Sequence, residues 1–447
     1  MRYIEQIKSI VLAVLILLSL ALTFTIWTFT PSLEPIVTTS VVEVELGEKR
    51  TVEQVVQPLK VLYQFSEENI TGTNDQEEVN LLLSEMKQWQ IHDLAMVVED
   101  APIETVKTYM HGTNRAVLYY PGPVPFPVFD EMMEITDKVI PEASFDRVVI
   151  EWGEGEMNAN DFTMYFINTK SGRVYTGSVS TIQLERFESM IVQRAFDYAP
   201  YITNEKIGEL PIYIQKNAKE VTTYRYLQED IAPQRFVDGL FENPSSVQST
   251  GAITNKEYSD ESDALMGVDD TEKSIIYVQP KAETSDPAIP SDLIFKTVDF
   301  INSHSGWTND YRYFEMAPLN QQIEYRLFVG GSPVFGSLAT NLTLNWGIDA
   351  EIEQIFRYER PFYILESWAE TGTTQLPSGE FILEAFNHLE KNELEAITDI
   401  IPGYELKRDE KEPERLLSLE PAWYFKADGK WRHLSKEMLG GGQVGLE

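Results

Sequence analysis

An apolar stretch near the amino terminus constrains the architecture of this chain more than any other feature. No charged residue occurs between Lys8 and Glu34, and the apolar core extends over residues 10–29. A helix of that length, at about 1.5 Å per residue, matches the roughly 30 Å hydrocarbon thickness of a bilayer, whereas a signal peptide has an apolar region of about 7 to 15 residues. Small residues such as Ala21 would suit a cleavage site, but the apolar run continues beyond them. We therefore expect a retained transmembrane anchor over residues 9–31.

The charges that flank this stretch predict its orientation. Arg2 and Lys8 lie on the short amino-terminal side, and the downstream flank begins with the acidic Glu34. The positive-inside rule then places residues 1–8 in the cytoplasm and residues 32–447 outside the cell, and Trp27 falls at the outer interface, where aromatic rings prefer to lie. We expect a single-pass protein of the cell membrane.

One face of the expected anchor is a candidate partner-binding surface. At 100° per residue, Ser9, Ala13, Ser19 and Thr23 fall within a sector of about 120°, and Trp27 lies in the same sector. Small and hydroxyl side chains let a second helix approach closely in lipid and form hydrogen bonds across the interface. Small residues are also common in membrane helices that bind no partner. We select these five residues as a hypothesis.

Composition limits the classes of partner and chemistry. The chain carries 71 acidic against 36 basic residues, a net charge of -35, which repels nucleic acid and anionic polymers. It contains no cysteine, which excludes disulfides, thiolate metal sites and a cysteine nucleophile. Hydrophobic residues make up 43% of the chain, enough for packed cores. We expect folded outer domains with a soluble, acidic surface and no binding of nucleic acid.

Hydrophobic periodicity after the anchor first predicts two helices. A capping-box start, Thr51 with Gln54, predicts a helix over residues 51–65 that Pro58 bends or ends. Apolar residues at helical spacing predict a second helix over residues 76–89.

Strand patterns dominate the rest of the chain. Residues 161–179 alternate on both sides of a Lys-Ser-Gly turn and predict a hairpin, which a helix over residues 182–198 follows. A helix that ends at Asn243 lies in the middle part, and the Pro- and Ser-rich residues 281–292 form the best linker candidate. Consecutive strands joined by tight turns indicate antiparallel sheets and an α+β fold with segregated helices. We expect three extracytoplasmic domains with helices packed on these sheets, over residues 32–199, 200–285 and 286–447.

Two short motifs invite a catalytic interpretation. Ser84 and Lys87 have the serine-lysine spacing of penicillin-interacting proteins, and Lys170-Ser-Gly resembles their third motif. Ser84 lies inside an amphipathic pattern instead of opening a helix, and Lys170 falls at the expected hairpin turn. We expect no catalytic residue.

Acidic clusters and histidines give no metal signature. Glu151, Glu154 and Glu156 lie close together, but they lack the alternating ligands and central glycine of a calcium loop. The five histidines have no ligand spacing, and His388 is expected on the surface. We expect no metal and no cofactor.

Three segments resemble a known family: the anchor region "IKSIVLAVLILLSLALTFTIWTFTPSLE", the middle segment "YRYLQEDIAPQRFVDGLFENPSSV" and the ending "AWYFKADGKWRHL". Together with the layout of the whole chain, they resemble the YycH family of regulators of the YycG (WalK) sensor histidine kinase. The resemblance implies three outer domains, the last two related in fold to YycI. It also implies a non-enzymatic role, in which the protein and a YycI-like partner adjust the autokinase activity of the kinase, largely through transmembrane helices, and so control cell-wall metabolism. The alternatives from the residues alone are an anchored enzyme and a ligand-binding module at the cell wall.

Overall fold

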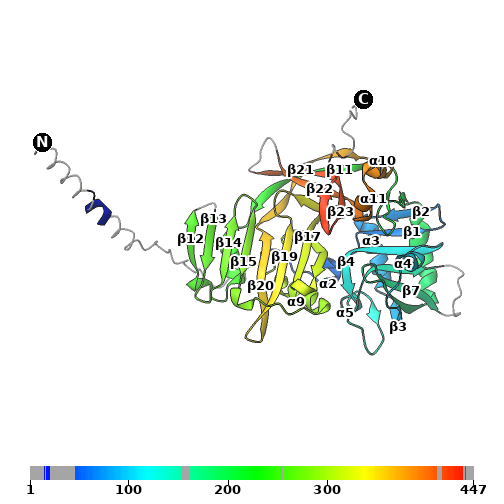
Figure 1. The fold of residues 1–447 in the computed structure, drawn as a ribbon, viewed down its shortest axis with the longest axis horizontal. Helices are drawn as coiled ribbons and strands as arrows, with labels where there is room; N and C mark the ends of the chain where they lie inside the picture. Colours follow the sequence, from blue (N-terminus) through cyan, green and yellow to red (C-terminus); the bar gives the residue numbers. More distant parts are fainter. Residues whose placement is uncertain are drawn as a thin grey trace, which may run out of the picture.

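The computed structural model describes residues 15, 17–20, 46–152, 161–252, 255–409, 415–435 and 438 (Figure 1). Within these residues the strands form two sheets, one of ten and one of fourteen strands. Most neighbouring strands are antiparallel, and the pairs β3–β5 and β18–β22 are parallel. The expected α+β class with antiparallel sheets is therefore confirmed.

The amino-terminal sheet has the strand order β10-β9-β2-β1-β4-β6-β7-β8-β3-β5. Its strands are β1 (Lys60–Gln64), β2 (Ile70–Thr73), β3 (Gln90–Val98), β4 (Arg115–Pro125), β5 (Glu134–Ile135), β6 (Ser144–Glu151), β7 (Asp161–Asn168), β8 (Arg173–Ser180), β9 (Ala199–Ile202) and β10 (Ile214–Gln215). The helices in this part are α2 (Val52–Val55), α3 (Gln76–Met86), α4 (Ile103–Met110), α5 (Phe126–Asp130), α6 (Thr181–Phe187), the π-helix η1 (Glu188–Val192) and α7 (Gln193–Ala195).

The carboxyl-terminal sheet has the order β12-β13-β14-β15-β20-β19-β17-β18-β22-β23-β11-β21, with β16 paired to β17 and β24 to β23. Its strands are β11 (Lys219–Asp230), β12 (Gln248–Ala252), β13 (Asn255–Ser259), β14 (Leu265–Asp269), β15 (Ser274–Val278), β16 (Tyr311–Ala317), β17 (Gln322–Val329), β18 (Ser332–Gly336), β19 (Asn341–Asp349), β20 (Ile352–Pro361), β21 (Tyr363–Leu376), β22 (Ile397–Arg408), β23 (Leu416–Ala427) and β24 (Lys430–His433). The helices are α8 (Pro233–Leu240), η2 (Pro244–Ser246), η3 (Pro280–Ala282), α9 (Pro290–Ser303), η4 (Pro318–Asn320), α10 (Gly379–Ala385), η5 (Phe386–His388) and α11 (Lys391–Glu395).

Local sequence signals explain several of these elements. Asp75 caps α3 by accepting hydrogen bonds from the backbone N–H groups of Glu77 and Glu78, and the expected apolar stripe of this helix faces the core. The hairpin β7–β8 closes at the pair Asn168 and Arg173, as its alternating pattern predicts. Both predictions are confirmed.

The helix predicted from Thr51 is confirmed for one turn and ends at Val55, before Pro58, so its extension to residue 65 is wrong. The helix α2 has only four residues, although the side chain of Gln54 accepts a hydrogen bond from Thr51 N at 3.0 Å, as the capping box requires. After Pro58 the chain becomes β1, whose residues are all buried and which lies between β2 and β4. Tertiary burial of this apolar segment in the sheet overrides its local helical pattern.

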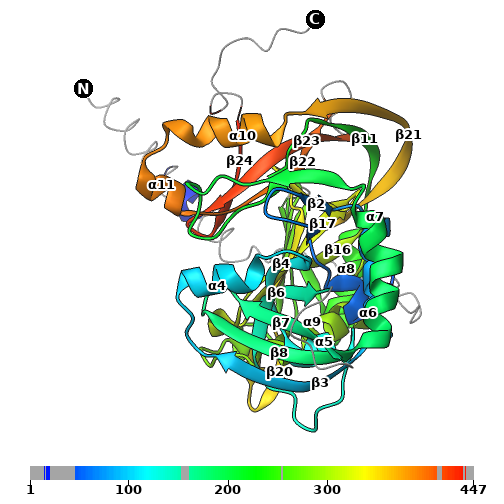
Figure 2. The same cartoon turned by 90° about the vertical axis from the view of Figure 1, so that its right-hand side faces the viewer.

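Strands from the expected second and third domains share the carboxyl-terminal sheet. Strand β15 pairs with β20, and β11 lies between β23 and β21. Figure 2 shows β11, β21, β22 and β23 above the amino-terminal sheet, with α10 and α11 on their outer side. The division into three domains stays a prediction.

Helix α9 joins the two sheets. It contacts α2, α5 and β4 of the amino-terminal part as well as β17 and β19 of the carboxyl-terminal sheet (Figure 1). One hydrophobic core therefore contains buried residues of both parts, among them Val61, Leu118, Ile294 and Leu344.

The expected anchor falls mostly outside the described residues. Residues 15 and 17–20 are helical and exposed. In the part of the chain that the structure describes, no helix combines the length and the apolar character needed to cross a bilayer.

Candidate coupling site between the entry segment and the carboxyl-terminal sheet

The described chain after the expected anchor begins with residues 46–51, the entry segment, which pairs with a distant part of the molecule. Glu48 forms an antiparallel bridge with Trp307, in which Glu48 N donates to Trp307 O at 3.2 Å. A Cβ atom at Gly47 would lie 2.6 Å from Trp307 O, so glycine permits this close backbone approach. Leu46 is buried in the shared core. The entry segment is thus attached to the loop after α9.

The side-chain amide of Asn302 binds the backbone of Arg50 in the entry segment. Asn302, near the end of α9, accepts a hydrogen bond from Arg50 N at 2.9 Å and donates one to Arg50 O at 2.8 Å. Its Oδ1 also accepts from the indole Nε1 of buried Trp307 at 2.8 Å. One amide group therefore satisfies both backbone groups of Arg50 and the polar atom of the tryptophan on which the segment rests.

Charge strengthens this attachment. Arg50 Nη1 lies 2.5 Å from Asp310 Oδ1, and Arg312 Nη2 lies 2.6 Å from Asp310 Oδ2. Burial acts to raise the pKa of Asp310, but the hydrogen bonds and charges of Arg312 and Arg50 outweigh it and hold the pKa below its ordinary value. Arg312 also donates to Gln76 Oε1 at the start of α3. The network therefore joins the entry segment, β16 and helix α3 of the amino-terminal part.

The loop that receives the entry segment rests on a buried cation. Arg360 on β20 is fully buried and donates to Gly306 O, to Thr308 Oγ1 and to Tyr358 OH, each at 2.9 Å. Its described hydrogen-bond partners include no carboxylate. Burial and then the charge of Arg360 lower the pKa of His304 to about 3, so this ring is neutral at physiological pH. These contacts hold residues 304–308 in one conformation.

Further hydrogen bonds fix the two parts against each other. Glu142 accepts from Ser291 N at 2.9 Å and from Ser291 Oγ at 2.7 Å, at the amino-terminal end of α9, where the helix dipole favours a carboxylate. Tyr313 OH donates to Pro123 O at 2.7 Å. The arrangement connects the first described segment after the expected anchor to the carboxyl-terminal sheet.

The residues predicted for the anchor face are not brought together in the described structure. Ser9, Ala13, Thr23 and Trp27 lie outside the described residues, and Ser19 is helical and exposed. This face stays a prediction. The contacts of Arg50 were missed, because they join residues 252 and 260 positions apart and no sequence motif marks either side.

The structure also places the residues of the apparent catalytic motifs. Ser84 Oγ donates to Asn80 O at 2.7 Å within α3, and Lys87 Nζ lies 2.6 Å from Glu53 Oε1. Among the described residues, no cluster of three histidine or acidic side chains could hold a metal ion. His388 is exposed, as expected.

Comparisons with known proteins identify the family. The model for the YycH protein N-terminal domain matches residues 5–194, and that for the YycH protein C-terminal domain matches residues 209–438. The curated two-component system WalR/WalK regulatory protein YycH of Bacillus subtilis (strain 168) is 22% identical over 454 residues, which cover 97% of each chain. The crystal structure of YycH from Bacillus subtilis matches with a TM-score of 0.72 at 17% identity, over 88% of this chain and 99% of that one. The chain belongs to the YycH family.

Proposed function

We propose that this protein is a membrane-anchored regulator of a WalK (YycG) sensor histidine kinase. The match to a curated WalR/WalK regulatory protein over 97% of both chains supports this role. In this proposal the protein has no enzymatic activity and acts by binding. It adjusts the autokinase activity of the kinase and, through it, genes of cell-wall metabolism.

The membrane arrangement belongs to the same proposal. Residues 9–31 cross the cell membrane once, residues 1–8 lie in the cytoplasm, and the remaining chain lies outside as three domains, of which the last two are related to the YycI fold. The apolar length and the flanking charges of the sequence support this arrangement. The partners are the kinase and a YycI-like protein, which contact the anchor face of Ser9, Ala13, Ser19, Thr23 and Trp27.

The attachment of the entry segment is the observation that favours coupling through the anchor. Arg50 and Glu48 form hydrogen bonds with Asn302, Trp307 and Asp310, so a displacement of the carboxyl-terminal sheet would displace the first described segment after the proposed anchor. A helix that packs differently against two states of a kinase shifts their equilibrium by its difference in affinity, and 1 to 3 kcal/mol changes the populations about 5- to 150-fold.

Reconstitution in vesicles tests the proposal. The WalK-type kinase of the same organism is combined with the full chain, and its rate of autophosphorylation is measured. Substitution of Ser9, Ala13, Ser19 and Thr23 by leucine should abolish the effect of the full chain, because bulky side chains prevent close helix packing. A control variant carries leucine at Ala21 and Thr25, which fall on the opposite side at 100° per residue.

The control variant should act as the parent chain does. An equal effect of the parent chain, the four-leucine variant and the control variant on autophosphorylation would contradict partner binding by the anchor face. A full chain that leaves autophosphorylation unchanged would contradict the regulatory role itself.

A further inference from the structure

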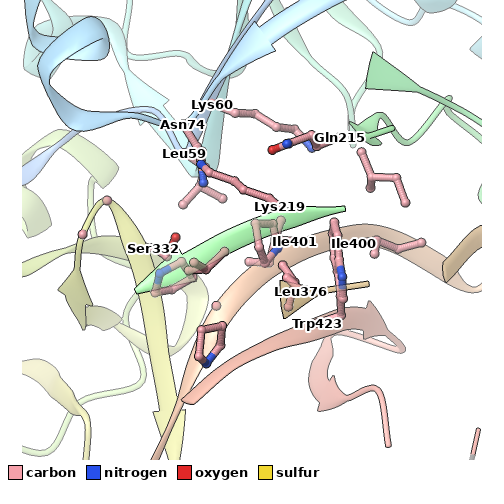
Figure 3. A pocket seen from close by; sticks show the side chains of 18 of the residues that line it. Leu59, Lys60, Asn74, Gln215, Lys219, Ser332, Leu376, Ile400, Ile401 and Trp423 are labelled. Carbon is pink, nitrogen blue, oxygen red and sulfur yellow. The ribbon is translucent and has the colours of Figure 1, made fainter. Parts of the chain in front are cut away.

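A cavity of about 90 Å³ lies where the two sheets meet. Its lining comes from both parts of the molecule, with Lys60 and Gln215 from the amino-terminal sheet and Lys219, Tyr404 and Trp423 from the carboxyl-terminal sheet. Figure 3 shows Lys60 and Gln215 on one side of this space and Ile400, Ile401 and Trp423 across from them. A volume of this size admits several water molecules or a small organic group.

A buried ammonium group with unused hydrogen-bonding capacity lines this cavity. Lys60 is 6% exposed, and its Nζ donates to Tyr213 O at 2.8 Å. The nearest carboxylate, Asp399 Oδ1, lies 3.7 Å away, and the ring centre of Tyr119 lies at 5.1 Å. An ammonium has three N–H donors; Tyr213 O accepts one and Asp399 forms an ion pair with the same group, which leaves at least one donor for a ligand.

The environment of Lys60 favours a further anionic partner. Burial lowers the pKa of this lysine, Asp399 acts in the opposite direction, and the charge of Arg147 lowers the pKa again. A buried charge with incomplete hydrogen bonding carries a desolvation cost that a ligand carboxylate would offset.

The charges of the lining point to the same ligand. The chain as a whole has a net charge of -35, yet the lining contains two lysines, Lys60 and Lys219, and a single acidic residue, Asp75. The carboxylate of Asp75 is already used, because it accepts hydrogen bonds from Glu77 N at 2.9 Å and Glu78 N at 3.3 Å as the cap of α3. The lining residues therefore carry one more positive than negative charge, and Asp399, which forms an ion pair with Lys60, lies beside them.

Part of the remaining wall is apolar. The lining includes four prolines, Pro333, Pro377, Pro402 and Pro421, beside the ring of Trp423. Trp423 Nε1 is itself engaged, since it donates to Pro377 O at 3.1 Å, so the indole offers its apolar surface. Such walls suit a short hydrocarbon group and reject a second charge.

We propose that this cavity binds a small carboxylate, such as a free short-chain acid or the carboxyl end of a peptide. The carboxylate contacts Lys60 and Lys219, and its hydrocarbon group contacts the prolines and Trp423. Because residues of both sheets line the cavity, the ligand bridges the two parts. Binding does not depend on the proposed function in kinase regulation, so either can fail without the other.

Titration calorimetry on the full chain in detergent micelles tests the site with propionate as the probe. Propionamide is the matched neutral control, since it has the same size without the charge. Propionate should bind saturably. Propionamide should bind at least about tenfold more weakly, because the loss of a charge-assisted hydrogen bond lowers the affinity by roughly that factor. N-acetyl-trialanine separates the two sources: tighter binding than propionate indicates a peptide end, and weaker binding indicates a free acid.

Two variants locate the site. Lys60→Met should abolish propionate binding. Lys219→Gln should weaken it about tenfold, and because Lys219 is exposed this substitution should not impair folding. Lys170→Gln changes an exposed lysine in the β7–β8 turn and should leave affinity unchanged. The proposal is overturned by equal binding of propionate and propionamide, by unaltered affinity in Lys219→Gln, or by no saturable binding at millimolar concentrations.

Discussion

Replacing Asn302 by alanine should release the entry segment without unfolding the molecule. The side chain makes three hydrogen bonds, with Arg50 N, Arg50 O and Trp307 Nε1, at 2.8 to 2.9 Å. Only the two bonds to Arg50 break when the segment opens, so at about 1 kcal/mol for each bond Asn302→Ala should lower the free energy of local opening by about 2 kcal/mol. Because 1.4 kcal/mol corresponds to a factor of ten, local opening becomes about thirtyfold more frequent.

Amide hydrogen exchange of the full chain in detergent micelles measures this opening. The informative amide is that of Glu48, because the substitution leaves its hydrogen bond to Trp307 O intact. Its hydrogen therefore exchanges only when the segment opens. The amides of β1 should keep their protection, since Asn302 makes no hydrogen bond to that strand. Asn392→Ala, at an exposed position on α11, is the matched control and should change nothing.

Equal exchange rates of Glu48 N in Asn302→Ala and Asn392→Ala would contradict this role of Asn302. An acceleration in β1 as large as that at Glu48 N would contradict it too, because the side chain of Asn302 would then support the whole amino-terminal sheet instead of the entry segment.

Two further predictions concern the loop that receives the segment. Arg360→Met should destabilise the protein by about 2 to 3 kcal/mol, measured by urea unfolding, because Gly306 O and Pro361 O lose their donor in a buried site; an unchanged midpoint would contradict this. The pKa of His304 is lowered from 6.5 to about 3 in the folded state. Between these two pH values the ring is protonated in the unfolded chain but neutral in the folded one, so stability falls as the pH decreases from 6.5 towards 3. In His304→Phe, this part of the pH dependence should be absent from unfolding curves measured across that range, and an unaltered slope would argue against a neutral buried ring.

Elements whose signals are local could be predicted from the sequence. The hairpin β7–β8 depends on alternation and on a glycine turn, since Gly172 has a positive φ of 68°. Helix α3 depends on its cap and its apolar spacing. In both, the deciding interactions lie within a few residues of one another, so periodicity is sufficient.

Elements that depend on distant partners could not be predicted. Residues 60–64 have a pattern compatible with a helix, and only their position between β2 and β4 makes them a strand. The attachment of Arg50 to Asn302 and the cavity around Lys60 both join segments far apart in the chain. Such sites have no periodicity, because each partner is an ordinary residue in its own local context.

The pairing of Glu48 with Trp307 also sets an order of events during folding. A chain is synthesised from its amino terminus, so the entry segment emerges long before residues 302–310 exist to receive it. Its docking waits for the loop after α9 and for Arg360, which lies further still along the chain. The closing of a contact over some 250 residues is slow and comes late. A docked entry segment therefore marks a molecule in which the carboxyl-terminal sheet has already formed.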